Sequence, residues 1–206
     1  MACDFDGDAL TDPVVYHDVD GYWYGASSAK GYALKEAHGC WAGYSPVPGD
    51  YDGDKLADPA AYYEEQTGNW VIGPSSSGYS LIRGVFGGPG WIAASADYDG
   101  DGKTDPAVYL PAVPSAQPMQ AGAPATAYWQ VLFSGSLDTQ GCYTWDNAIL
   151  ATTGGIPVPA DYDGDGKADM AVYHQDTGIW QLFLSTQGYQ EVSDGFGDPA
   201  YQPALE

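Results

Sequence analysis

The chain contains four copies of one acidic nine-residue segment, each with aspartate at positions 1, 3, 5 and 9. The copies are residues 4–12, 50–58, 97–105 and 161–169. Four carboxylates this close together repel one another, so such a loop is favourable only around a cation. The spacing is that of the first nine positions of an EF-hand loop, without its glutamate at position 12. We therefore expect four metal-binding loops, called loops one to four below.

The expected ligands of each ion are the four carboxylates and the backbone carbonyl at position 7. This flexible, anionic, all-oxygen set suits Ca²⁺ better than Zn²⁺ or the stricter octahedron of Mg²⁺. Position 6 is Gly102 and Gly166 in loops three and four but Ala9 and Lys55 in loops one and two, where a sharp turn is harder and we expect weaker binding. The predicted ligands of up to four Ca²⁺ ions are Asp4, Asp6, Asp8, Leu10, Asp12, Asp50, Asp52, Asp54, Leu56, Asp58, Asp97, Asp99, Asp101, Lys103, Asp105, Asp161, Asp163, Asp165, Lys167 and Asp169.

The loops mark an internal repeat with a period of about 47 residues, which is the range of propellers and arrays. The third repeat is longer because residues 111–126, rich in Pro, Ala and Gln, form an insert that we expect to be a surface excursion between two strands. We predict one repeat domain over residues 1–206. Its repeats are residues 4–49, 50–96, 97–160 and 161–206.

Each repeat has the same order of strand and turn signals. A short β-rich segment follows each loop, and after a turn comes a segment containing tryptophan (Trp23, Trp70, Trp129 and Trp180). A Ser/Gly turn then leads to a third strand expected to begin at tyrosine (Tyr32, Tyr79 and Tyr189), and a Gly-rich bend and a Pro/Val segment lead into the next loop. Short β-rich segments and frequent turns predict an all-β protein.

Three to four antiparallel strands per repeat predict a β-propeller with four blades, or half of a larger propeller. The repeated tryptophans and the tyrosines that follow the loops are expected to fill the core between blades. Residues 201–204 align with residues 44–47, so a four-blade ring could close by placing the C-terminal segment before Asp4. The alternatives are an open arc and a homodimer that forms an eight-blade ring.

The charge of the chain limits its partners. The formal net charge is −22, with only six Lys and Arg, and four bound Ca²⁺ ions would still leave the protein acidic. This argues against nucleic acid and anionic membrane surfaces as partners. There is no run of 18 apolar residues, so we expect no membrane insertion. Because free Ca²⁺ is scarce in the cytosol, the loops predict a secreted or cell-surface protein, and Met1 and Leu205-Glu206 suggest a piece of a longer precursor.

Residues with reactive side chains form no catalytic pattern in the sequence. Cys3, Cys40 and Cys142 have no CxxC spacing, and either a Cys3–Cys40 bridge or unpaired core cysteines would fit their positions. His17 and His174 occupy equivalent places after the first strand and are expected to be structural. No nucleophile or phosphate-binding motif occurs, so we expect no enzyme activity.

The order Asp-Tyr-Asp-Gly-Asp-Gly-Lys-x-Asp, Ala-Val-Tyr, Gly-x-Trp, Ser-x-x-Gly-Tyr, Phe-Gly and Pro-Val-Pro resembles the FG-GAP/VCBS-type repeats of secreted bacterial proteins. The loop alone is similar to the calcium loops of integrin α-subunit propellers. The resemblance implies a propeller-like fold with Ca²⁺ in one loop per blade, and a role in adhesion, surface display or carbohydrate recognition. The first repeat departs from it, with His38-Gly39 in place of Phe-Gly, and the third has Asp146-Asn147 there.

Two functions are therefore expected. The first is a calcium-stabilised structural, adhesive or protein-interaction scaffold that binds another surface protein. The second is a lectin-like propeller, or an accessory module of a polysaccharide-acting enzyme, that stacks sugar rings on aromatic side chains. The candidate aromatic residues are Trp41, Trp91, Trp145, Tyr44 and Tyr201.

Overall fold

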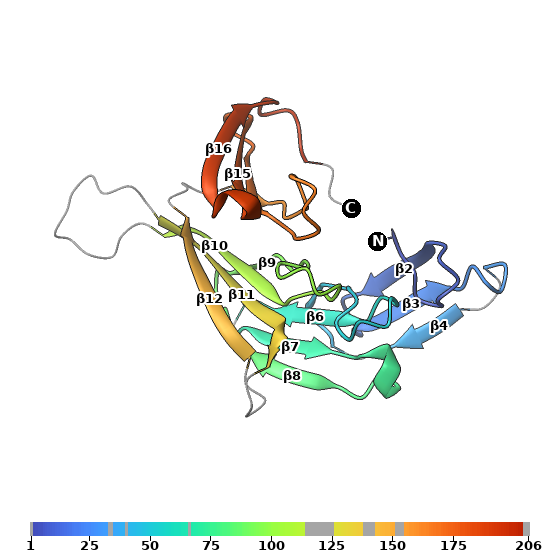
Figure 1. The fold of residues 1–206 in the computed structure, drawn as a ribbon. Helices are drawn as coiled ribbons and strands as arrows, with labels where there is room; N and C mark the ends of the chain where they lie inside the picture. The colour runs from blue at the N-terminus through green and yellow to red at the C-terminus, as the bar shows by residue number, and fades with distance from the viewer. Residues whose placement is uncertain are drawn as a thin grey trace. The chain divides into compact units, whose positions relative to one another are not determined.

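The computed structural model describes residues 2–32, 35–39, 41–65, 67–113, 126–137, 143–150 and 155–203. The protein is all-β, as predicted, and its strands form four antiparallel sheets of four strands each. Each sheet is built from one continuous stretch of chain, seen in Figure 1 as a single run of colour for each group of labelled strands. The repeat deduced from the sequence therefore corresponds to one sheet, except that the first strand of every sheet comes from the segment before the loop, including β1 at Ala2–Cys3.

The strands of the first two sheets have these bounds: β1 (Ala2–Cys3), β2 (Asp12–His17), β3 (Tyr22–Ala26), β4 (Lys35–His38), β5 (Ser45–Pro46), β6 (Ala60–Tyr63), β7 (Asn69–Ile72) and β8 (Ile82–Val85). Those of the third and fourth sheets are β9 (Ile92–Ala93), β10 (Ala107–Val113), β11 (Thr126–Leu137), β12 (Tyr143–Leu150), β13 (Ile156–Pro157), β14 (Met170–His174), β15 (Ile179–Leu184) and β16 (Gln190–Gly195). Two short 3₁₀ turns, η1 (Ser75–Ser77) and η2 (Ser185–Gln187), lie between the third and fourth strands of their sheets.

The chain divides into two compact units. Of the described residues, the first contains those up to Pro89 and Gly102–Thr104, and the second contains Gly90–Asp101 and those from Asp105 onward. Sheets one and two belong to the first unit, and sheets three and four to the second.

In each unit, the face of one sheet that carries its buried tryptophan packs against the next sheet. In the first unit Trp23 packs in one cluster with Ala61 and Val71 of sheet two. In the second unit Trp129 packs in one cluster with Met170 and Val172 of sheet four. Large aromatic rings thus meet small or branched side chains across the interface, and burial of this apolar area stabilises each pair of sheets. The predicted core role is confirmed for these two tryptophans.

The strand after the Ser/Gly turn is the third after the loop and the fourth of its sheet, and it begins later than the sequence suggested. Tyr32, Tyr79 and Tyr189 were expected to start it but have left-handed backbone conformations, with φ of 61°, 63° and 60°. The N–H group of Tyr189 donates to the carbonyl of Leu184 at 2.9 Å, which closes the 3₁₀ turn. The strand therefore starts only after this turn, at Gln190 in sheet four.

The expected insert lies between β10 and β11, which pair with each other. The structure extends the strands into it, since β10 runs to Val113 and β11 starts at Thr126. Residues 114–125 lie outside the described part of the chain, and so do Cys40 and Cys142.

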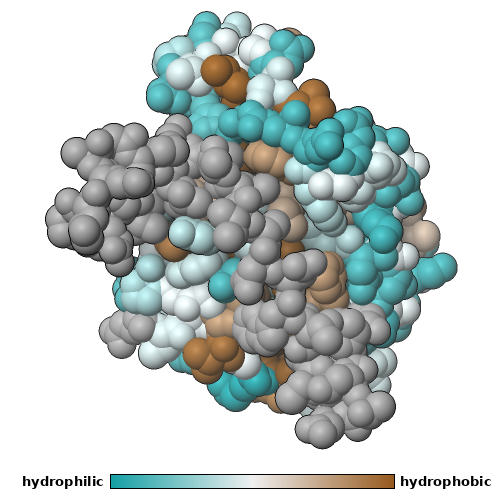
Figure 2. Space-filling view, turned by 60° about the vertical axis from the view of Figure 1, so that its left-hand side comes forward, coloured by the Kyte–Doolittle hydropathy of each residue, from teal (hydrophilic) through white to brown (hydrophobic). Residues whose placement is uncertain are grey.

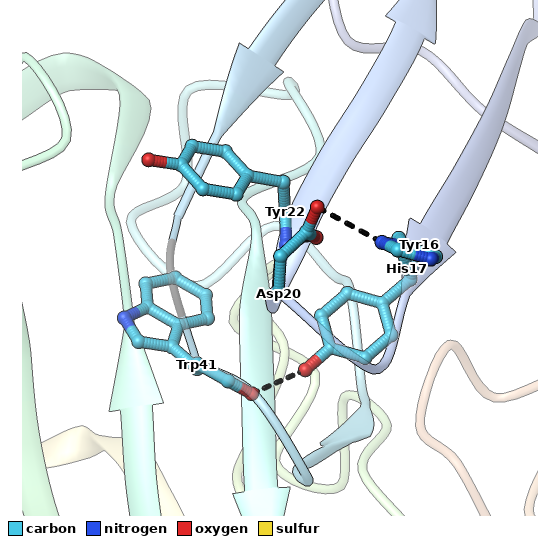
Figure 3. A network of polar contacts seen from close by, with 5 residues as sticks. All are labelled: Tyr16, His17, Asp20, Tyr22 and Trp41. Atoms are coloured by element: carbon cyan, nitrogen blue, oxygen red, sulfur yellow. Dashed lines mark hydrogen bonds and ion pairs between the residues drawn. The ribbon is translucent and has the colours of Figure 1, made fainter.

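The tyrosine on the first strand after the loop also fixes the bend at the far end of the sheet. The Tyr16 hydroxyl donates to the Trp41 carbonyl at 2.5 Å, beside a polar contact of 2.9 Å between His17 Nδ1 and an Asp20 carboxylate oxygen (Figure 3). In sheet two the equivalent Tyr62 hydroxyl accepts from the Gly88 N–H group at 2.9 Å. These contacts give the recurring tyrosine a second, polar role in addition to packing.

Among the coloured residues of the face drawn in Figure 2, hydrophilic residues are widespread and hydrophobic residues form small separate groups. The most exposed hydrophobic side chains are Phe196 at 79% and Val19 at 76%. Among the described residues, no helix has both the length and the apolar character needed to cross a membrane.

Candidate metal centres

Each acidic loop is closed at its base by pairing of the residue before the first aspartate with the ninth residue. Gly49 pairs with Asp58, Ala96 with Asp105 and Ala160 with Asp169 as antiparallel bridges. In loop one the same positions are joined by the pairing of β1 with β2, at Cys3 and Asp12. Consequently the eight intervening residues must turn within a short closed arc.

The carboxylates hold this arc by accepting backbone hydrogen bonds, as loop four shows. Asp161 Oδ1 accepts from the Gly164 N–H group at 2.6 Å, and its Oδ2 accepts from Gly166 at 3.0 Å. Asp165 Oδ1 accepts from the Lys167 N–H group at 2.8 Å. Aspartate side chains commonly form such local turns, and here they point several carboxylates toward the inside of the same loop.

The geometry brings three of the four predicted carboxylates of every loop together. Within each group the potential ligand atoms lie within 4.8 Å of one another. The groups are Asp4, Asp6 and Asp8; Asp50, Asp52 and Asp58; Asp97, Asp99 and Asp101; and Asp161, Asp163 and Asp169. This donor set of clustered carboxylates fits a hard divalent cation such as Ca²⁺.

The ninth aspartate has a structural role that the sequence did not reveal. In all four loops this side chain is buried, with at most 1% exposure. Asp169 Oδ2 accepts from the Tyr162 N–H group at 2.9 Å, and Oδ1 accepts from the Ser185 N–H group at 2.7 Å. It therefore connects the start of the loop to the turn after β15. Burial raises the pKa of Asp58 and Asp105 to about 6, as expected for carboxylates removed from water.

Serine and threonine hydroxyls from that turn reach the carboxylates at positions 3 and 5. In loop four the Ser185 hydroxyl donates to Asp165 Oδ2 at 2.6 Å, and the Thr186 hydroxyl donates to Asp163 Oδ2 at 2.5 Å. The Ser185 hydroxyl lowers the pKa of Asp165, because a donated hydrogen bond favours the ionised form.

Contacts of this kind recur in the other repeats, where the sequence pattern alone predicts only a turn at these residues. In loop two they join Ser75 to Asp54 at 2.5 Å and Ser76 to Asp52 at 2.7 Å. The matching contacts are Ser28–Asp8 in loop one and Ser134–Asp101 in loop three. In loop one the hydroxyl on Asp6 comes from Ser27, one residue earlier, and Ala29 takes the place of Thr186. The available signal was spacing: the first contacting serine follows the ninth aspartate by 16 or 17 residues in loops four and two.

Position 6 has a left-handed backbone in all four loops. The φ angles are 64° at Ala9, 74° at Lys55, 86° at Gly102 and 87° at Gly166. Glycine adopts this conformation freely, whereas alanine and lysine are strained there. The sharp turn expected at position 6 is thus present in every loop, and two loops form it with a less suitable residue.

Consecutive loops are joined by one repeated backbone contact. The Asp4 carbonyl accepts from the Ala57 N–H group at 2.7 Å, and the Asp97 carbonyl accepts from the Ala168 N–H group at 2.6 Å. Each bond joins position 1 of one loop to position 8 of the next. Beside the first bond, a Cβ added to Gly7 would lie 2.9 Å from Leu56 Cδ2, so the two loops are in close contact.

The aromatic residues considered for sugar stacking have different environments. Trp41 is 5% exposed and belongs to the core cluster of Trp23. Tyr44 stacks on Tyr63 with ring centroids 4.9 Å apart. Tyr201 is 62% exposed, and the side chain of Trp145 lies outside the described part. The buried Trp41 ring therefore has little surface on which a sugar could stack, whereas stacking on Tyr201 remains a prediction.

An aromatic hollow lies beside Tyr201 in the second unit. It has a volume of about 620 Å³ and includes Tyr173, Trp180 and Phe196 among its lining residues. The Trp180 Nε1–H group donates to the Phe196 carbonyl at 3.0 Å, which fixes the indole at the wall.

No family model, curated protein or solved structure matches the chain. The four loops and their repeated contacts are therefore the features from which a function can be inferred.

Proposed function

We propose that the chain is a calcium-binding repeat module of a secreted or cell-surface protein, with one Ca²⁺ in each loop. The observation that carries this proposal is the convergence of three carboxylates, within 4.8 Å, in all four loops. Bound calcium supplies the positive charge that offsets their mutual repulsion. Ligand sets of this kind in extracellular modules bind Ca²⁺ with a Kd of roughly 10⁻⁴–10⁻³ M, which suits an environment rich in calcium.

In this proposal the module is a β-propeller that serves as an adhesive or protein-interaction scaffold. Support comes from the four four-stranded antiparallel sheets and from the tryptophan side of one sheet packing on the next in each unit. A closed four-blade ring and half of a larger propeller both use this packing. Residues 201–203, proposed to close the ring, lie outside the strands of the described chain.

Calorimetric titration with Ca²⁺ and thermal unfolding with and without chelator test the calcium proposal. Ca²⁺ at 100 times its Kd stabilises the folded state by about 2.7 kcal/mol per site, so chelation should lower Tm markedly. Asp163→Ala should remove one site and a larger part of this stabilisation than Asp6→Ala, because loop one contains the strained Ala9. Asp176→Ala, outside the loops, is the control. Identical melting curves in calcium and in chelator would contradict the proposal.

Carbohydrate recognition is a second candidate because of the aromatic hollow in the second unit. The exposed rings of Phe196 and Tyr201 offer apolar surfaces to a sugar ring. A glycan array on calcium-loaded protein, repeated with Phe196→Ala, tests this function. Binding that survives this substitution would place the ligand elsewhere, and an array without binding would leave the scaffold function alone.

A further inference from the structure

The turn between the third and fourth strands carries two consecutive hydroxyl residues in three of the four repeats. They are Ser75-Ser76 and Ser185-Thr186 at equivalent places, and Ser27-Ser28, which lies one residue earlier relative to its loop. In each pair both hydroxyl groups donate to carboxylates of the acidic loop in the same repeat. This turn is far from the loop in sequence, and a solvent-facing turn would not need the contact.

We propose that this hydroxyl pair is a positioning element of the calcium site, which sets the affinity of the loop without contacting the ion. The inference rests on the proposed calcium binding. In loop four, two residues orient three carboxylates: Ser185 through its N–H group to Asp169 and its hydroxyl to Asp165, and Thr186 through its hydroxyl to Asp163.

The contacts are compatible with a bound ion because a carboxylate offers about four lone-pair sites on its two oxygens. Asp163 and Asp165 each use Oδ2 for the hydroxyl and Oδ1 for a loop N–H group, at 3.3 Å and 2.8 Å respectively. Both oxygens therefore keep acceptor capacity for a cation. The side chains are nevertheless held in one orientation before the ion arrives.

Such preorientation favours binding for two reasons. An exposed aspartate that is already fixed loses less rotamer freedom when it binds the ion. The hydrogen bond that the Ser185 hydroxyl donates to Asp165 also favours the ionised carboxylate that a cation binds. Loss of an outer partner of a metal ligand typically weakens metal affinity about 10–100-fold.

The third repeat provides a natural contrast. Its turn supplies the Ser134 hydroxyl, which lies 3.2 Å from both carboxylate oxygens of Asp101. Glycine follows Ser134 in the sequence, where Thr186 follows Ser185 in the fourth repeat, so the two repeats differ in sequence at this position. Loop three is therefore a suitable internal reference for substitutions at residue 186 in loop four.

A site-resolved NMR titration with Ca²⁺ tests the proposal on the whole chain. The amide signals of Gly164 and Gly166 report loop four, and those of Gly100 and Gly102 report loop three in the same sample. Thr186→Val removes the hydroxyl at nearly constant shape, and we expect it to raise the loop-four Kd about 10-fold or more while loop three is unchanged. Thr186→Ser keeps the hydroxyl and should restore the affinity.

The matched control is Thr177→Val, since the Thr177 hydroxyl contacts the His174 carbonyl at 3.4 Å and no loop. An unchanged loop-four Kd in Thr186→Val would overturn the positioning role and leave calcium binding intact. An equal loss in loops three and four would also overturn it, because it would indicate a general structural effect. Absence of calcium shifts in the unsubstituted protein would instead refute the proposed function itself.

Discussion

The strained sixth position gives a prediction that does not require bound calcium. Ala9 has φ of 64° in loop one, and Gly166 has φ of 87° at the same place in loop four. Exchanging these residue types, as Ala9→Gly and Gly166→Ala, should change stability in opposite directions. The second substitution is especially clean, because a Cβ on Gly166 would meet no atom within 4 Å.

The magnitude follows from two opposing contributions. A left-handed conformation costs a residue with a Cβ roughly 1–2 kcal/mol, whereas replacing glycine by alanine recovers about 0.4–1 kcal/mol of unfolded-state entropy. The net effect is about 1 kcal/mol, stabilising for Ala9→Gly and destabilising for Gly166→Ala. For a single unfolding transition of a chain this long, Tm should shift by about 2–4 °C.

Calorimetric or circular-dichroism melts, in calcium and in calcium-free buffer, measure both shifts. Because the strain lies in the backbone, we expect the same sign under both conditions. Ala42→Gly is the control: Ala42 is exposed and is absent from the residues with positive φ, so glycine there should reduce stability. If Ala9→Gly lowered Tm as Ala42→Gly does, the argument from the left-handed turn would be refuted.

Two further predictions concern packing and pH. Phe86 is 7% exposed, and its ring centroid lies 5.1 Å from that of Trp70. Phe86→Ala should lower the free energy of unfolding by about 3–5 kcal/mol, whereas Phe196→Ala, at an exposed site, should lower it by about 0.5 kcal/mol or less. Denaturant unfolding of the two variants compares these losses. In calcium-free buffer the folded-state pKa of Asp58 and Asp105, about 6, lies above the ordinary 3.8. Their contribution to stability is thus present below about pH 4 and is lost as the pH rises through 6, and denaturation at several pH values should show it.

The acidic loops and the sheet architecture were accessible from sequence because their signals are local. The spacing of aspartates fixes which carboxylates share a loop, and the recurring Trp70-type segment marks one strand per repeat. The contact of Ser185 with Asp169 was not predicted, because serine beside glycine signals a turn whether or not that turn meets another segment. The conformation of Tyr189 was missed for a related reason: a tyrosine normally favours a strand, and the turn bond to Leu184 overrides that preference.

The bonds between consecutive loops also bear on how such a chain can evolve. Both partners are backbone groups, so the bond places no demand on the side chain at position 8, which is alanine at Ala57 and Ala168 but threonine at Thr11 and Thr104. Each repeat brings one acceptor at its first aspartate and one donor at position 8. Duplicating or deleting a whole internal repeat therefore preserves every such pair at the new junction. Gene-level changes in repeat number are thus compatible with keeping this bond between neighbouring loops of one unit, while side chains elsewhere in the repeats diverge.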